Sequence, residues 1–229
     1  MGLNIVVGIL ADPELDDAAD EFGEDFTAIR QALAEARLPD WAEPDLPAET
    51  GDFEMYGYSG LHNLRRLAVH LTETGALPAR QDTLKAADDP LLAQVYTRHP
   101  HHAVKIGDTV RVIGSAEGAA GRFDHLVHHS DCQGFYVPVD FAPVLIDGRV
   151  TGAYIGSSQR LLEECRRLAE QLGLPEDLDP WSDEVDEALE GEGVVREGWQ
   201  RYGVESFTCL QLMAAARQSI ATGAAMVFC

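Results

Sequence analysis

The chain has 229 residues, of which 45% are hydrophobic and 24% charged, as in an ordinary globular protein rather than a disordered one. Its 39 acidic residues outnumber its 17 basic ones, which gives a formal net charge of −22. This balance argues against a basic surface for nucleic acid or for an anionic membrane. We therefore expect no nucleic acid and no membrane among the partners, and instead a basic protein or a small anionic ligand.

The compartment is indicated by features that the sequence lacks. The apolar run at residues 3–11 is short, has no basic residue before it and continues into acidic residues, unlike a signal peptide. No stretch of 18 apolar residues could span a membrane. The four cysteines are scattered without a CxxC pair: Cys132, Cys165, Cys209 and Cys229. This pattern predicts a cytoplasmic protein with free thiols.

Charge is unevenly distributed along the chain. Residues 1–60 hold 15 acidic and 2 basic residues, and residues 163–197 hold 13 acidic and 3 basic ones. Residues 61–162 are balanced, with 10 of each sign, and contain all eight histidines. Such acidic segments are commonly the solvated faces of helices. The alternative is an acidic surface that attracts a basic partner.

The first half of the chain predicts one strand and three helices. Residues 4–10 are short, apolar and β-branched, as in a buried strand. Residues 16–37 and 59–74 carry apolar residues at spacings of three and four, which predicts a helix over each range. A shorter helix is predicted over residues 88–97. Three prolines and no period predict a surface loop over residues 38–52.

The middle of the chain has the composition of strands and turns. Residues 102–114 resemble strand material with a Gly-Asp turn, and residues 123–129 and 134–141 are predicted as two further strands. Residues 144–152 are predicted as a short hairpin with Asp147-Gly148 at its turn.

The last third returns to helices. Helices are predicted over residues 157–172, 182–190 and 204–222, followed by a strand over 224–229. An apolar strand at each terminus indicates that both ends join one sheet. We therefore predict a single α+β domain over residues 1–229, with a central, mostly antiparallel sheet that includes both terminal strands and about five or six flanking helices.

The polar cluster in the middle of the chain holds three His, three Asp and one Cys within 18 residues. In a strand, His125, His129 and Asp131 would share one face, because side chains alternate with a period of two. Two imidazoles and a carboxylate are ligands for a divalent metal such as zinc, iron or manganese. Asp140 and His62 are candidates for further ligands.

Other interpretations of this cluster remain open. In a helix, His125, His128, His129 and Cys132 would converge instead. The imidazoles could also bond to the backbone and solvent, or form another kind of polar binding site. The spacing matches no established metal signature, and the HPHH tract at residues 99–102 lies in a predicted loop.

A thiol enzyme is a further possibility. Cys132, His129 and Asp131 are the residue types of a nucleophile, a base and an orienting group. Adjacent residues rarely point at one another, so His62 or His125 would be a better base. The alternative is an inert, partly buried cysteine.

Free backbone amides at a predicted helix start could hold an anion. Gly156, Ser157 and Ser158 open a helix, where the amides and the helix dipole favour negative charge, and Arg160 adds a cation. The alternative is an ordinary serine N-cap. The candidate ligand-binding residues are these three and four others: His62, Arg65, Arg66, Tyr136, Gly156, Ser157 and Ser158.

The acidic string EDLDPWSDEVDEALEGE at residues 176–192 lacks the spacing and the glycine of a calcium-binding EF-hand loop. We interpret it as a solvated helix face.

Several segments together resemble an uncharacterised family of bacterial proteins with no known activity. They are the LHNLRR helix at 61–66, the HxxxHSDCxGFYVPVDF segment at 125–141, GSSxxLLEE at 156–164 and the final VFC. The resemblance implies a bacterial cytosolic protein. It points to no particular activity. The matching polar and glycine positions are His62, Arg65, Arg66, His125, His129, Asp131, Cys132, Gly134, Tyr136 and Asp140.

Two functions from different classes follow. The first is an acidic binding protein that recognises a protein partner or a small ligand, such as an inhibitor or an immunity-like factor. The second is a hydrolase with a metal held by His62, His125, His129, Asp131 and Asp140, or with Cys132 as nucleophile.

Overall fold

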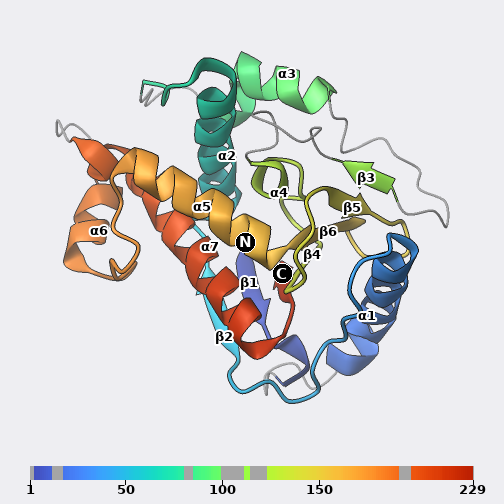
Figure 1. Ribbon diagram of the computed structural model, residues 1–229. Helices are drawn as coiled ribbons and strands as arrows, with labels where there is room; N and C mark the ends of the chain where they lie inside the picture. Colours follow the sequence, from blue (N-terminus) through green and yellow to red (C-terminus); the bar gives the residue numbers. More distant parts are fainter. Residues whose placement is uncertain are drawn as a thin grey trace.

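A sheet of seven strands forms the centre of the computed structural model (Figure 1). The structure describes residues 3–11, 18–79, 85–98, 111–113, 123–190 and 197–228. The strands are β1 (Asn4–Val7), β2 (Gly51–Glu54), β3 (Arg111–Ile113), β4 (Phe135–Val137), β5 (Val144–Ile146), β6 (Tyr154–Ser157) and β7 (Met226–Phe228). They lie in the order β2-β1-β7-β4-β6-β5-β3. All neighbouring described pairs are antiparallel except β4 with β6, so the predicted sheet with both terminal strands is confirmed.

Both faces of the sheet are covered, because alternate residues of its central strands enter different hydrophobic cores. In β1, Ile5 and Val7 join a core that includes residues of the helices at 57–74, 158–172 and 203–222, whereas Val6 joins the core against the first helix. In β4, Tyr136 enters the first core and Phe135 enters the second. This two-sided burial explains why the strands are almost entirely apolar.

Seven α-helices surround the sheet in the described residues: α1 (Ala18–Glu35), α2 (Gly57–Thr74), α3 (Pro90–Arg98), α4 (Asp124–Val127), α5 (Ser158–Leu172), α6 (Asp183–Leu189) and α7 (Gly203–Thr222). The six predicted helices are confirmed, and each end lies within two residues of its predicted position. Short 3-10 turns lie at Ile9–Ala11, Ala86–Asp88 and Gly198–Tyr202. In Figure 1, α5 and α7 lie side by side in front of the sheet, and α1 lies apart from them.

The helix α4 replaces a predicted strand over residues 123–129, which was wrong. The carboxylate of Glu164, on α5, accepts hydrogen bonds from the backbone N–H groups of His125 (3.0 Å) and Leu126 (2.7 Å). These amides lie in the first turn of α4, where a helix has no internal acceptor for them. A residue 39 positions away therefore stabilises a helical turn that the local sequence does not favour.

Two strands lie where the sequence did not place them. β2 extends the sheet beyond β1 from the end of the segment predicted as a loop. β5 pairs with β6 rather than within residues 144–152, so the hairpin is longer than predicted. Of the strand predicted over residues 102–114, only β3 lies within the described residues.

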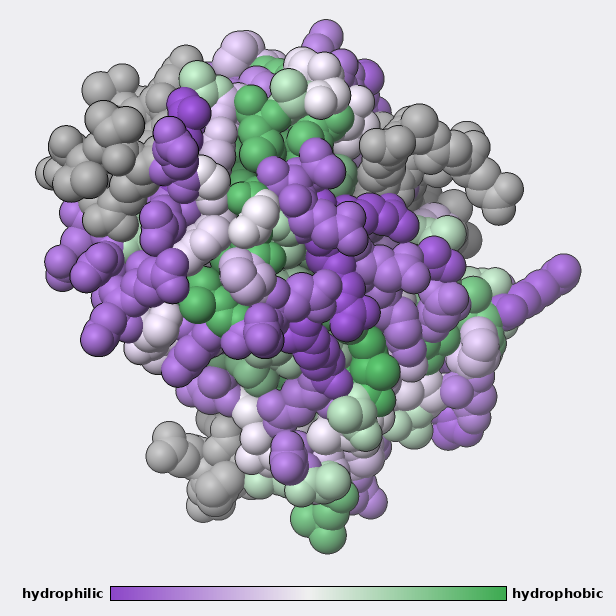
Figure 2. All heavy atoms as spheres, turned by 60° about the vertical axis from the view of Figure 1, so that its left-hand side comes forward, coloured by the Kyte–Doolittle hydropathy of each residue, from purple (hydrophilic) through white to green (hydrophobic). Residues whose placement is uncertain are grey.

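The longest helix, α7, is buried on several sides because it packs against α2, α5, α6 and β2. No helix in the described part of the chain is long and apolar enough to cross a membrane. Hydrophilic side chains cover most of the face in Figure 2, which brings forward the side of the molecule with α6.

Candidate functional site

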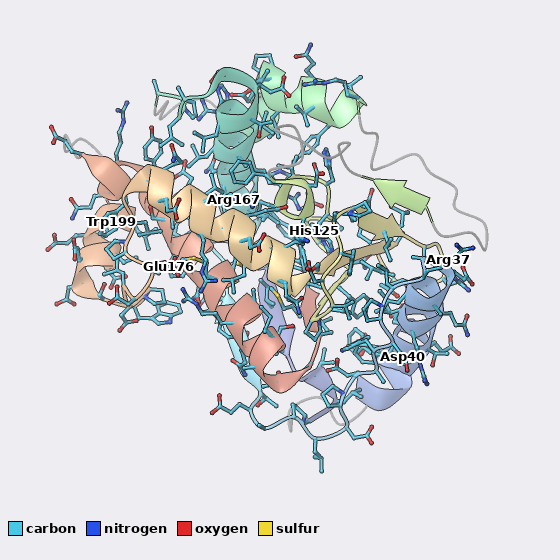
Figure 3. The ribbon with its side chains drawn as sticks, in the orientation of Figure 1. Arg37, Asp40, His125, Arg167, Glu176 and Trp199 are labelled. Atoms are coloured by element: carbon cyan, nitrogen blue, oxygen red, sulfur yellow. The ribbon has the colours of Figure 1, made fainter. Side chains whose placement is uncertain are left out.

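The two histidines proposed as metal ligands lie in the interior and use their ring nitrogens on the backbone. His125 is 1% exposed, and its Nδ1 accepts a hydrogen bond from the N–H of Ser157 at 2.9 Å. Its Nε2 therefore carries the proton and donates to the carbonyl of Ala142 at 2.8 Å. Burial lowers the pKa of His125 to about 4, so this ring is neutral near pH 7. Figure 3 shows His125 inside the molecule.

His129 is held in a similar way. Its Nε2 lies 3.0 Å from the carbonyl oxygen of Phe135, and its Nδ1 lies 3.3 Å from that of Ser130. The ring stacks on Tyr136 with centroids 3.9 Å apart. Burial lowers the pKa of His129 to about 3. A neutral ring that faces two carbonyls has little capacity left to bind a metal or to take a proton from a thiol.

The two carboxylates of the predicted cluster each have another partner. Asp131 lies 2.9 Å from His62 Nε2, and this hydrogen bond holds the pKa of Asp131 well below its usual range. Asp140 forms an ion pair with Arg160, with 2.6 Å between Oδ1 and Nε. Since residues 123–129 are not a strand, the shared face on which the metal hypothesis depended does not exist. Among the described residues, no group of three or more His, Cys, Asp or Glu could hold a metal ion, so the hydrolase alternative has no support.

A cavity of about 230 Å³ does bring five of the predicted residues together: His62, Arg65, His129, Asp131 and Cys132. Cys132 is exposed, and its Sγ lies 3.9 Å from the hydroxyl of Ser130. No imidazole contact of this thiol appears among the described residues. The predicted triad of Cys132, His129 and Asp131 is therefore not assembled, because His129 and Asp131 are committed to other groups.

The paired arginines of α2 stabilise neighbouring helices. Arg65 is buried and donates from Nε to the carbonyl of Leu126 at 2.7 Å, and from Nη2 to those of His129 and Ser130. It thereby satisfies carbonyls at the end of α4, where helices lack internal donors. Arg66 donates from Nε to Asp89 at 2.6 Å.

Asp89 links α2 to the start of α3. Its Oδ1 accepts the N–H groups of Leu91 and Leu92, and its Oδ2 also contacts His70 at 2.9 Å. Burial alone would raise the pKa of Asp89, but the hydrogen bonds from His70 and Arg66 outweigh it and hold the pKa at about 2. The carboxylate therefore stays ionised at neutral pH.

The predicted anion site at the start of α5 is closed by packing. A Cβ on Gly156 would lie 2.3 Å from Cδ1 of Tyr136, whose ring covers this position. Ser157 caps α5 by accepting from the N–H of Arg160, and the hydroxyl of Ser158 contacts that of Ser219 at 2.8 Å in the core. Tyr136 itself is buried and donates to the carbonyl of His125. The predicted ligand-binding residues are thus not gathered around one open site.

The surface of the segment between α5 and α7 is strongly acidic. Seven carboxylates are exposed in residues 177–190: Asp177, Asp179, Asp183, Glu184, Asp186, Glu187 and Glu190. No lysine or arginine occurs in this segment. None of the seven forms an ion pair within the described part of the chain, whereas Glu176 is paired with Arg166 and Arg217. Figure 3 shows Glu176 near α5 and α7.

The helix that carries most of these carboxylates is fixed by its inner face. Val185 and Ala188 are buried in the core against α7. A Cβ on Gly203 would lie 2.2 Å from the carbonyl oxygen of Ala188, so glycine is required for α7 to start this close to α6. The solvated helix face predicted from the acidic string therefore has a rigid support.

A family model described as "Putative DNA-mimic protein" matches residues 1–228. This confirms the resemblance of the chain to a protein family of no known activity, and it supports an acidic, protein-binding function. Comparison with curated proteins and with solved structures finds no match.

The match corrects the predicted partners, from which nucleic acid was excluded. A family of DNA mimics points to a DNA-binding protein as partner, which conflicts with that exclusion. An acidic surface repels the phosphates of DNA and so disfavours direct binding. The same negative charge can, however, occupy the place of DNA on a DNA-binding protein.

Proposed function

This chain belongs to the family described as "Putative DNA-mimic protein", and we propose from this membership that it occupies the DNA-contacting surface of a DNA-binding protein and thereby competes with DNA. The observation that carries the proposal is the row of seven exposed carboxylates in residues 177–190, none of which forms an ion pair with another described residue. The proposal places the protein in the cytoplasm, where bacterial DNA-binding proteins act.

The charge requirement of such a partner is simple. DNA presents about one negative charge per 1.7 Å of its axis, and proteins meet it with Lys and Arg. A mimic must therefore present closely spaced negative charges that its own cations do not neutralise. Residues 177–190 meet this condition within the described chain, because their carboxylates have no cationic partner there.

The geometry of α6 places four of these charges in one stripe. Asp183, Asp186, Glu187 and Glu190 recur at intervals of three and four residues, opposite the buried Val185 and Ala188. Like charges at these intervals destabilise a helix by about 0.2–0.5 kcal/mol per pair. A partner that brings cations would remove this repulsion on binding, which adds to the affinity.

The experiment is a release assay on immobilised duplex DNA. Cell extract is bound to the DNA at about 50 mM salt, where phosphate contacts are strong. The purified protein is then added at the same salt, and the released proteins are identified. The matched variant carries Asp183→Asn, Asp186→Asn, Glu187→Gln and Glu190→Gln, which keep shape but remove charge.

We expect the wild-type protein to release a defined DNA-binding protein and to co-purify with it, and the neutralised variant to release much less. A second control neutralises Glu21 and Glu24 on α1, which are exposed and lie on another helix. Equal release by wild type and the α6 variant, or no release at all, would contradict the proposal.

A further inference from the structure

An exposed aromatic patch lies next to the acidic helix. Trp181 is 57% exposed and Tyr56 is 45% exposed. Both rings contact the buried ring of Phe207, at centroid distances of 5.3 Å and 6.4 Å and with edge-to-face geometry. Three segments therefore contribute to one patch: the turn before α6, the residue before α2, and α7.

The patch has a fixed position. The backbone N–H of Trp181 donates to Asp179 Oδ1 at 2.9 Å, which orders the turn before α6. On the other side, a Cβ on Gly60 would lie 2.5 Å from Oγ1 of Thr208, so α2 and α7 are in close contact beside Tyr56. The indole is thus an exposed, oriented surface and not the end of a loosely held loop.

Charge determines what this patch can bind. Asp177, Asp179, Asp183 and Glu184 lie within four residues of Trp181, and none forms an ion pair within the described residues. A purely apolar partner would remove water from these carboxylates without replacing its hydrogen bonds, which is unfavourable. Nucleic acid would be repelled. A cation removes both obstacles.

Among cations, arginine suits the site better than lysine. Its flat guanidinium can stack on an indole and at the same time donate several hydrogen bonds to carboxylates. Lysine offers a compact charge that is more strongly hydrated. Tryptophan and arginine are also both enriched among the residues that contribute most of the binding energy at protein interfaces.

We infer that Trp181 is the anchor of the docking surface, and that it stacks with an arginine of the partner's DNA-contacting surface while Asp179 and Asp183 accept its hydrogen bonds. This inference rests on the proposed function and deepens it, since it names the contact at which the partner is recognised. Tyr56 forms the edge of the same surface.

Short peptides test this contact without knowledge of the partner. Tetra-arginine and tetra-lysine carry equal charge and are titrated separately into the full-length protein at low salt, with tryptophan fluorescence as readout. The other two tryptophans, Trp41 and Trp199, are 8% and 9% exposed, so a change on binding reports chiefly on Trp181. We expect tetra-arginine to bind about 2- to 30-fold more tightly than tetra-lysine, as a cation–π contact predicts.

The variant Trp181→Ala should lose this preference and bind both peptides equally. Because its fluorescence no longer reports on the patch, the affinities of wild type and variant for the two peptides are also compared by isothermal titration calorimetry. Leu46→Ala is the matched control, because Leu46 is a large hydrophobic residue that is 85% exposed and lies outside the patch. Circular dichroism verifies that each variant is folded. Equal affinity of the wild type for the two peptides, or a preference that persists in Trp181→Ala, would overturn the inference.

The two proposals fail in different ways. If Trp181→Ala releases proteins from DNA as well as the wild type does, the anchor is refuted and the DNA-mimic function stands. If the wild type releases nothing from DNA but prefers tetra-arginine through Trp181, the arginine site stands and the proposed function is refuted.

Discussion

At the scale of single residues, the histidines predicted as metal ligands or catalytic bases instead form hydrogen bonds in the interior. His125 and His129 were predicted from residue type and spacing, and both do lie close together. Their ring nitrogens are used by backbone groups that no local pattern reveals, since the partners come from Ala142, Ser157 and Phe135. A sequence identifies polar residues in a core more readily than it tells a buried network from an active site.

The buried His129 predicts a loss of stability in acid. Its pKa is about 3 in the folded protein and near 6.5 in the unfolded chain, so the unfolded state binds more protons between these values. The stabilising contribution is complete above pH 6.5 and is lost as the pH falls. The variant His129→Phe has no titratable ring at this position, so its stability lacks this dependence on pH. It is nevertheless less stable than the wild type at pH 7, because the carbonyl of Phe135 loses its donor. Urea unfolding at pH 7 and pH 5 should show the difference between wild type and variant shrinking at pH 5; a constant difference would contradict it.

Glu43 predicts the opposite dependence on pH. Burial raises its pKa from 4.5 to about 8, while one of its oxygens accepts the N–H of Ala225 at 2.7 Å. Stability from this group is complete below pH 4.5 and is lost as the pH rises toward 8. Glu43→Gln keeps an acceptor and removes the charge. Thermal melts from pH 5 to pH 8.5 should therefore show the melting temperature of the variant rising relative to that of the wild type as the pH rises. A gap that stays level across this range would refute the assignment.

At the scale of elements, helices were predicted more accurately than strands. The apolar stripes of α2 and α5 fixed their positions to within two residues, because amphipathic periodicity is a local property. The strand β2 could not be anticipated at the end of a proline-rich segment, since it pairs with β1, which is distant in sequence. α4 likewise depends on Glu164 and Arg65, which are distant in sequence.

The dependence of α4 on Glu164 can be measured. Glu164→Ala removes the acceptor of two buried N–H groups and should lower the free energy of unfolding by about 2–5 kcal/mol. Glu164→Gln keeps one carbonyl oxygen and should lose less. Chemical denaturation of the three proteins gives the order directly. If the alanine variant equalled the wild type, the carboxyl would have no part in holding α4.

The acidic helix shows where composition was more informative than motif. Residues 176–192 were interpreted as a solvated face, and the described part of that face is indeed exposed. The signals that could have led to the proposed docking surface were the absence of any lysine or arginine in the segment and the tryptophan within it. Neither belongs to a catalytic or metal-binding signature, so a search for such motifs passed over both.

At the scale of the whole molecule, a net charge of −22 has a cost that salt should relieve. Self-repulsion destabilises the folded state, and added ions screen it. We expect the melting temperature to rise when NaCl increases from about 20 to 200 mM. The neutralised α6 variant should show a smaller rise. A melting temperature that falls with salt would mean that the ion pairs of this protein outweigh its repulsion.

A competition experiment tests most directly whether this protein occupies the place of DNA. The DNA-binding protein recovered in the release assay is loaded with labelled duplex DNA, and fluorescence polarisation is followed as the acidic protein is added. Polarisation should fall to the value of free DNA, and the variant neutralised on α6 should need a large excess to achieve this. Polarisation that stays constant or rises, as in a complex of all three components, would contradict the account.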